Sequence, residues 1–224
     1  MKWEVVGDKD SLCCVFFAGF GFKTSVYKDF LPQNTLVVFD YSDFSNAKDL
    51  LHILKQKYFK LIAFSMGVCV ANSLLNSLRE NITHSYAING TPLGIDKTMG
   101  IHPTLFTHTI KHFSQQAFVQ NCFNANNMLD SNTMLHNNDT LLSELKSLQI
   151  FCKNQNLPPH TFIWDKAVIA LKDYIFKPQA QNLAWSAYKE LYDAYFENKK
   201  MFQICHIDAP HFIFKDNNAY KTVC

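Results

Sequence analysis

The sequence predicts an α/β fold, a mostly parallel sheet flanked by helices, and two observations support that prediction. Over the first 90 residues, short apolar runs alternate with amphipathic segments, and the joins between them are short. The same alternation returns after residue 165. Strands and helices that alternate with short connections are typical of parallel sheets with right-handed crossovers.

The composition is that of a folded chain with enough residues for a complete core. The chain has 224 residues, of which 48% are hydrophobic and 18% are charged. A chain of this length can bury a full core as one domain. We therefore expect a single domain over residues 1–224, with a helical insertion at about 95–160.

The first 90 residues supply most of the predicted sheet. The run at 11–20 is apolar almost throughout, which indicates a strand covered on both faces. A helix at 23–31 is expected to stop before Pro32. The other expected strands are 2–6, 35–41, 60–64 and 84–90, and the other expected helices are 46–58 and 66–78.

Residues 91 to about 160 interrupt this alternation. They contain an Asn-rich section and an amphipathic segment at 140–154 that indicates a helix. We expect them to form a helical insertion over the sheet. The alternation then resumes with a strand and turn within 165–176, a helix at 178–200 that has Pro178 in its first turn, a strand at 201–207 and a terminal helix at about 215–222.

Charge and cysteine content exclude several classes of protein. The net charge is only +2, and no basic cluster with interleaved aromatic residues is present, so we expect no nucleic-acid partner. No stretch approaches the ~20 apolar residues of a membrane-spanning helix, and the first residues do not resemble a signal peptide. Seven cysteines without a CxxC pair indicate reduced thiols, which predicts a cytoplasmic protein.

Ser65 lies between an expected strand and an expected helix, in the stretch A-F-S-M-G. Two interpretations remain open for it. The serine either caps an ordinary helix, or it is a nucleophile on the sharp strand-to-helix turn of the α/β-hydrolase fold. That turn needs small residues two positions before and after the serine, where this chain has Ala63 and Gly67.

A nucleophilic serine needs a general base, which in α/β-hydrolases comes last in the chain. Of the nine histidines, only His206 and His211 belong to the last expected strand or follow it. His211 lies in the loop after that strand, where a catalytic histidine is expected. His206 falls within the strand or at its end and is interpreted as structural.

The acid that orients the histidine should follow the penultimate strand. Asp173 lies just beyond the apolar run at 167–171, at the carboxyl end of the sheet where sites of α/β folds assemble. Asp165 precedes that strand and so lies at the wrong end. Asp208, three residues before His211, is the main rival, and a simple turn aspartate is the structural alternative for Asp173.

Acyl transfer also needs donors for the oxyanion. We expect one to be the backbone N–H of Met66, directly after the serine, and the other to be the N–H of Phe20, which Gly19 and Gly21 flank. A nucleotide-binding loop is the alternative for this glycine pair. The chain, however, has neither GxGxxG nor GxxxxGK[ST] at this point.

Two further groups of residues are candidate sites. His108 and His112 lie four apart, but without an HExxH motif or an obvious third ligand they do not predict a metal site, and no cofactor is expected. Cys69 falls within an apolar helix and is interpreted as a small core residue.

Several blocks of the sequence together resemble the BioG-type pimeloyl-acyl carrier protein methyl ester esterases, small α/β-hydrolases of biotin synthesis. The blocks run in order from about residue 12 to 214. They are FFAGFGF, DYSDF, AFSMGVCVAN, AINGTPLGID with MGIHP, AVIALKDYIFKPQAQNLAW and DAPHFIF.

The resemblance implies that Ser65, Asp173 and His211 form a catalytic triad and that the amides of Phe20 and Met66 form the oxyanion hole. It also implies a lid at the insertion and, as partner, an acyl carrier protein bearing a pimeloyl methyl ester. Acyl carrier proteins are acidic, and the basic residues of the insertion include Lys111, Lys146 and Lys153.

Two other functions remain open at this point. The chain could be another serine hydrolase, such as a thioesterase or a short-chain carboxylesterase. It could also be a catalytically silent α/β-hydrolase fold that binds a ligand. For any of these functions we expect a monomer.

Overall fold

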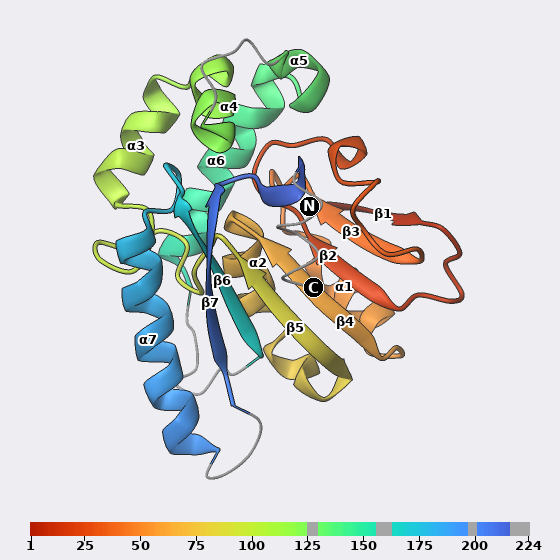
Figure 1. Cartoon of the computed structure of the whole chain (residues 1–224). Helices are drawn as coiled ribbons and strands as arrows, with labels where there is room; N and C mark the ends of the chain where they lie inside the picture. The colour runs from red at the N-terminus through yellow and green to blue at the C-terminus, as the bar shows by residue number, and fades with distance from the viewer. Residues whose placement is uncertain (125–129, 156–162, 197–200, 216–224) are drawn as a thin grey trace.

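The computed structural model describes residues 1–124, 130–155, 163–196 and 201–215 (Figure 1). Its strands form one sheet in the order β1-β3-β2-β4-β5-β6-β7, in which β1 runs antiparallel to β3 and the other pairs are parallel. The strands are β1 Lys2–Val6, β2 Cys14–Phe17, β3 Thr35–Phe39, β4 Phe59–Phe64, β5 Ile82–Ile88, β6 Lys166–Lys172 and β7 Gln203–Pro210. The predicted mostly parallel α/β sheet is therefore confirmed.

The central strands are apolar because helices and the insertion cover them. All four residues of β2 are buried, as are five of the six residues of β4. Strands buried on both faces lose the polar alternation of a half-exposed strand. Both run parallel to their neighbours, so their carboxyl ends meet at one edge of the sheet, followed by the turns at Phe20 and Ser65.

Three helices follow strands as the sequence predicts: α1 Ala47–Leu54, α2 Met66–Leu74 and α7 Pro178–Tyr195. Helix α2 is shorter than expected and passes into a 3-10 turn, Asn76–Asn81. Pro178 begins α7, where its missing N–H costs nothing. The described part of the chain ends in a 3-10 turn, Ile213–Lys215, and residues 216–222 of the expected terminal helix lie outside it.

The helix predicted at 23–31 was wrong. Only a 3-10 turn forms there, Thr24–Val26. Tyr27 is fully buried, and its ring lies 4.9 Å from that of Phe16 and 5.7 Å from that of Phe212. Burial of this ring in the aromatic core fixes the segment as an irregular connection, which overrides its weak helical pattern.

Residues between β5 and β6 form helices α3 Pro103–Lys111, α4 Gln115–Phe123, α5 Ser131–Met134 and α6 Asn138–Lys153. Figure 1 shows these four helices gathered at one end of the sheet. Each begins at a capping side chain, as at Ser114, whose Oγ accepts the N–H of Ala117. The helix predicted at 140–154 corresponds to α6.

Candidate active site

Ser65 lies on a strained turn between β4 and α2. Its backbone has φ 57° and ψ −127°, a conformation that costs a non-glycine residue free energy. Its N–H donates to the carbonyl of Ile88 at 2.9 Å, which fixes the turn against β5. Ser65 does not accept a helix N–H with its side chain, so the interpretation as a helix cap is not supported.

Gly67 permits the close approach of the turn to β2. A Cβ atom at this position would lie 2.4 Å from the carbonyl oxygens of Phe17 and Ala18. The same holds on the other side of the turn, where a Cβ on Gly90 would lie 2.2 Å from the Ser65 carbonyl oxygen. Any larger residue would therefore push the serine out of place.

The structure brings His211 to Ser65. The His211 Nε2 atom lies 3.0 Å from Ser65 Oγ, although 146 residues separate them in the sequence. Both side chains are buried, and the imidazole packs near the rings of Phe64 and Phe176, with centroid distances of 4.8 Å and 6.3 Å. This packing restricts the orientation of the histidine.

Asp173 binds the other nitrogen of the same imidazole. Its Oδ2 lies 2.8 Å from His211 Nδ1, so that nitrogen is the donor and Nε2 is free to accept the serine proton. Its Oδ1 accepts the backbone N–H groups of Ile175 and Phe176, each at 2.8 Å. These bonds hold an aspartate that is almost fully buried.

The rivals considered for these roles lie elsewhere. Asp208 is exposed and pairs with Lys172 at 2.8 Å. His206 is exposed and contacts Asn182 at 2.8 Å. Asp165 accepts the N–H of Ser85, at the opposite end of β6 from Asp173.

Two polar residues that bind Asp173 or His211 were not predicted from the sequence. Gln181, on α7, donates from Nε2 to Asp173 Oδ2 at 3.1 Å and to the Phe176 carbonyl at 2.7 Å. Asn89 donates from Nδ2 to the His211 carbonyl at 2.6 Å, and its Oδ1 accepts the Ala170 N–H at 2.8 Å.

Asn89 therefore joins the backbone of the histidine loop to β6. It has φ 48°, a left-handed conformation that asparagine adopts more readily than most residues. The dipeptide Asn89-Gly90 at the end of a strand was the signal in the sequence. Nothing local, however, indicated a partner 122 residues away.

Phe20 and Met66, the expected oxyanion donors, both line a cavity that reaches Ser65. Met66 is the first residue of α2, so its N–H has no acceptor within the helix. Within the described residues, the N–H of Phe20 has no acceptor either. The turn at Phe20 packs directly on the serine, since a Cβ on Gly19 would lie 3.1 Å from Ser65 Cβ.

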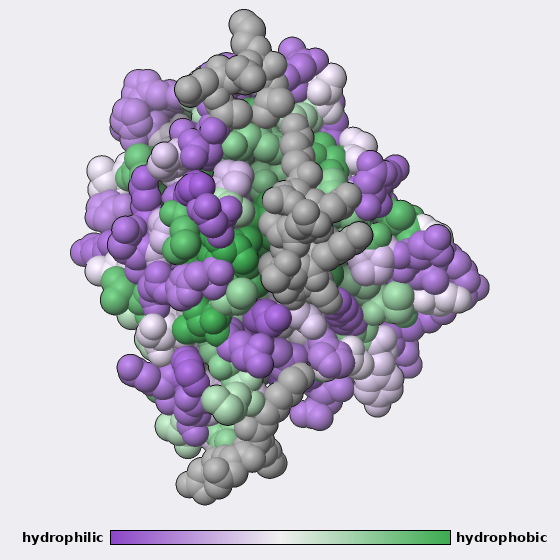
Figure 2. All heavy atoms as spheres, viewed as in Figure 1, coloured by the Kyte–Doolittle hydropathy of each residue, from purple (hydrophilic) through white to green (hydrophobic). Residues whose placement is uncertain are grey.

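The cavity has a volume of about 240 Å³ and a mainly apolar lining. The insertion supplies one wall and the segment after Asp173 supplies another. The lining residues are Phe20, Ser65, Met66, Ile101, Leu105, Phe106, Thr109, Phe118, Asn121, Leu145, Tyr174, Ile175 and Lys177. Figure 2 shows apolar surface on this face between the insertion and α7.

Among the described residues, no group of three His, Cys, Asp or Glu side chains could hold a metal ion. The rings of His108 and His112 lie 4.7 Å apart without a third ligand. Cys69 is buried with its sulfur 3.4 Å from that of Cys152, and burial raises the pKa of the Cys69 thiol. No helix of the described chain is long and apolar enough to cross a membrane.

The sequence of the chain matches a known protein family over almost its whole length. The family described as pimeloyl-ACP methyl esterase BioG matches residues 1–221. The chain belongs to the BioG family. The resemblance found in the sequence is thus confirmed.

Solved structures agree on the fold. The crystal structure of BioG from Haemophilus influenzae matches with a TM-score of 0.79 and 22% identity, over 100% of this chain and 99% of its own. The α/β hydrolase MGS-M2, from a deep-sea metagenome library, matches with a TM-score of 0.61 and 13% identity, over 99% and 90%. The predicted α/β-hydrolase fold is therefore confirmed.

A curated relative is a larger protein. The malonyl-acyl carrier protein O-methyltransferase of Bacteroides fragilis is 32% identical over 181 residues, which cover 78% of this chain. The chain spans only 36% of the length of that relative.

Proposed function

We propose that the chain is a serine carboxylesterase that hydrolyses the methyl ester of pimeloyl-acyl carrier protein, releasing methanol, in biotin synthesis. The observation that carries this proposal is the bridging position of His211, with Ser65 on one ring nitrogen and Asp173 on the other. Membership of the BioG family supports the choice of substrate.

In the first half of the reaction, Ser65 Oγ attacks the ester carbonyl carbon while His211 Nε2 takes the hydroxyl proton. Asp173 holds the imidazole in the tautomer that accepts this proton and stabilises the imidazolium. The N–H groups of Phe20 and Met66 donate to the oxyanion. His211 then returns the proton to the methoxy oxygen, the C–O bond breaks and methanol leaves.

In the second half, water replaces methanol. His211 takes a proton from the water as its oxygen attacks the acyl carbon, and the same two N–H groups stabilise the second oxyanion. Collapse of this intermediate returns the proton to Ser65 Oγ. The product is a free carboxylate at the far end of the chain that remains on the carrier, and no metal or cofactor takes part.

The cavity fits the distal part of an acyl chain. Apolar side chains, including Phe106 from α3, Phe118 from α4 and Leu145 from α6, form most of its lining. A methyl ester is neutral and can enter such a site, whereas a free carboxylate would lose its hydration there. The cavity therefore favours the esterified substrate over the product.

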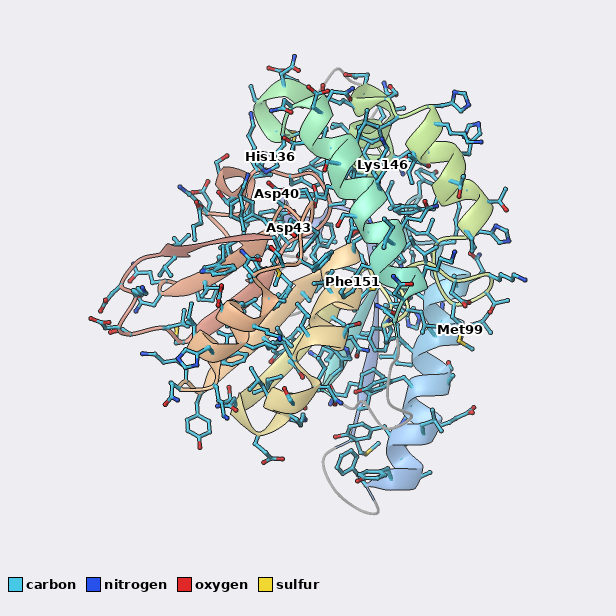
Figure 3. All side chains as sticks on the ribbon, turned by 180° about the vertical axis from the view of Figure 1, so that it is seen from behind. Asp40, Asp43, Met99, His136, Lys146 and Phe151 are labelled. Carbon is cyan, nitrogen blue, oxygen red and sulfur yellow. The ribbon has the colours of Figure 1, made fainter. Side chains whose placement is uncertain are left out.

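An acidic acyl carrier protein would bind near the mouth of this cavity. Lys177 lines the cavity and is exposed, with its ammonium 5.2 Å from the centre of the Tyr174 ring. Lys111, Lys146 and Lys153 are also exposed, and Lys146 is labelled on α6 in Figure 3. We assign these three lysines to the carrier surface. The insertion at 95–160 is proposed as the lid of a monomeric, cytoplasmic enzyme.

Incubation of the protein with pimeloyl-acyl carrier protein methyl ester, followed by intact-mass analysis, tests the substrate. The proposal predicts a carrier product lighter by one methylene group, with the thioester intact, and no product with Ser65→Ala. Release of the acyl chain from the carrier with the methyl ester untouched would instead identify a thioesterase. A short-chain carboxylesterase would cleave small methyl esters and leave the carrier-bound ester intact.

A fluorophosphonate probe separates an enzyme from a silent fold. The proposal predicts labelling of the wild type and none of Ser65→Ala, because the probe reacts with an activated serine. Absence of labelling in the folded wild type, or equal labelling of both proteins, would support the silent fold.

A further inference from the structure

Glu144 is a buried carboxyl group in the insertion that the proposed reaction does not use. It lies on α6, is fully buried and accepts the backbone N–H of Tyr41 at 3.2 Å through Oε1. Its Oε2 has no hydrogen-bond partner among the described residues. Burying a carboxyl group costs free energy unless it is hydrogen-bonded, so the surroundings of Glu144 are informative.

Hydrogen bonds connect Glu144 to the turn that carries Phe20. Tyr41, whose N–H Glu144 binds, is fully buried and donates from its hydroxyl to the Ala18 carbonyl at 2.8 Å. Ala18 begins the oxyanion turn, defined here as residues 18–22. Glu144 thus fixes the tyrosine, and the tyrosine fixes the first peptide of the oxyanion turn.

Helix α6 also contacts this turn directly. A Cβ atom at Gly21 would lie 2.7 Å from a methyl carbon of Leu141, three residues before Glu144, so the helix packs on the glycine itself. Gly21 has φ 81°, a conformation that favours glycine and turns the chain after Phe20.

The segment before α6 pairs with the same turn. Phe22 forms an isolated antiparallel bridge with Leu135. The N–H of His136 donates to the Gly21 carbonyl at 3.0 Å, and the N–H of Lys23 donates to the Met134 carbonyl at 2.9 Å. The insertion therefore holds the C-terminal end of the oxyanion turn directly, and it reaches Ala18 at the other end through Glu144 and Tyr41.

We propose that Glu144 is a positioning residue that, through Tyr41, sets the direction of the Phe20 N–H toward the oxyanion. This inference rests on the proposed function, because it assumes that Phe20 is an oxyanion donor. Helix α6 would then support the oxyanion turn through Glu144, and it also forms a wall of the cavity through Leu145.

Burial keeps the carboxyl group of Glu144 mainly protonated at pH 7. Burial raises its pKa to about 8, although the N–H of Tyr41 favours the charged form. Asp40 also raises it, whereas the Met1 ammonium lowers it. Figure 3 shows Asp40 and His136 on neighbouring loops beside the first half of α6.

Steady-state ester hydrolysis by three variants tests the inference. Glu144→Leu removes the acceptor for the Tyr41 N–H, and Tyr41→Phe removes the donor to Ala18. Leu148→Ala is the matched control, because Leu148 is buried on the same helix but lines no part of the cavity. The trifluoromethyl ketone analogue of a short methyl ester, which forms an oxyanion adduct with the serine, is used as a probe of the oxyanion hole.

The first two variants should lower kcat about tenfold with KM unchanged, below the 10²- to 10³-fold typical for complete loss of an oxyanion donor. They should weaken ketone inhibition by a similar factor, and Glu144→Gln, which keeps an acceptor oxygen, should restore most of the kcat lost in Glu144→Leu. Leu148→Ala should lower the melting temperature without changing ketone affinity.

The inference is overturned if Glu144→Leu and Tyr41→Phe affect only the melting temperature, as Leu148→Ala does. In that case, if the wild type still hydrolyses the ester and Ser65→Ala does not, the proposed function is retained and only the role of Glu144 is rejected. Failure of the wild type to hydrolyse any ester while it still folds would instead overturn the proposed function.

Discussion

Asn89 and His211 are joined by a hydrogen bond of 2.6 Å from the Asn89 amide to the histidine carbonyl, which fixes the loop that carries the imidazole. Asn89 lies directly after β5, and the same side chain also binds the backbone of β6. The position of the histidine is therefore set by the sheet as well as by Asp173.

Loss of this connection should reduce both stability and turnover. We expect Asn89→Ala to lower the free energy of unfolding by about 2 kcal/mol or more, because it leaves two buried backbone groups unpaired. It should also lower kcat by at least tenfold, because the histidine loop is released. Urea unfolding and ester hydrolysis measure the two effects.

Asn182→Ala is the control for that change. Asn182 also binds a histidine, but the histidine is the exposed His206. Asn182→Ala should change the free energy of unfolding and kcat only slightly. Equal effects of the two substitutions would contradict the role assigned to Asn89.

The two candidate acids can be separated by paired substitutions. Asp173→Asn should lower kcat by about 10⁴-fold, because an amide stabilises neither the required tautomer nor the imidazolium. Asp208→Asn should have almost no effect, because Asp208 is exposed and pairs with Lys172 at the surface. Loss of turnover in Asp208→Asn alone would show that the acid is misassigned.

Gly67→Ala should prevent the turn at Ser65 from forming. Its Cβ would meet backbone carbonyl oxygens, which cannot move as a flexible side chain can. We expect a loss of several kcal/mol in the free energy of unfolding. Ser73→Ala on the same helix should be close to neutral. A Gly67→Ala protein with wild-type stability and activity would show that the turn tolerates a side chain.

The buried Glu144 predicts a pH dependence of stability. An unfolded chain releases this proton near pH 4.5, whereas the folded protein keeps it until about pH 8. Between these values the folded state binds more protons, so the wild type loses stability as pH rises. Glutamine does not titrate, so the Glu144→Gln variant does not lose stability in this way as pH rises. Urea unfolding at pH 5 and pH 8 should show the variant gaining roughly 2 to 4 kcal/mol relative to the wild type at the higher pH. A difference independent of pH would contradict the assigned pKa.

The sequence located the residues that follow strands because strand ends in a parallel sheet meet at one edge. Ser65, Asp173 and His211 each follow a strand, so their meeting could be predicted from chain order. Gln181 and Glu144 could not be found in this way. Both lie on helices in otherwise ordinary patterns, and only tertiary packing shows which buried groups they face.

The local sequence pattern also gave a wrong prediction where packing in an aromatic core determines the backbone conformation. The segment at 23–31 has helical spacing, but Tyr27 is buried among rings from distant parts of the chain. Those contacts outweigh a propensity worth a few tenths of a kcal/mol per residue.

The most direct test of the central claim is intact-mass analysis of pimeloyl-acyl carrier protein methyl ester after incubation with the wild type and with Ser65→Ala. The account predicts that the wild type converts the ester to the free acid on an intact thioester and that Ser65→Ala leaves it unchanged. Persistence of the methyl ester with folded wild type, or equal conversion by Ser65→Ala, would contradict it.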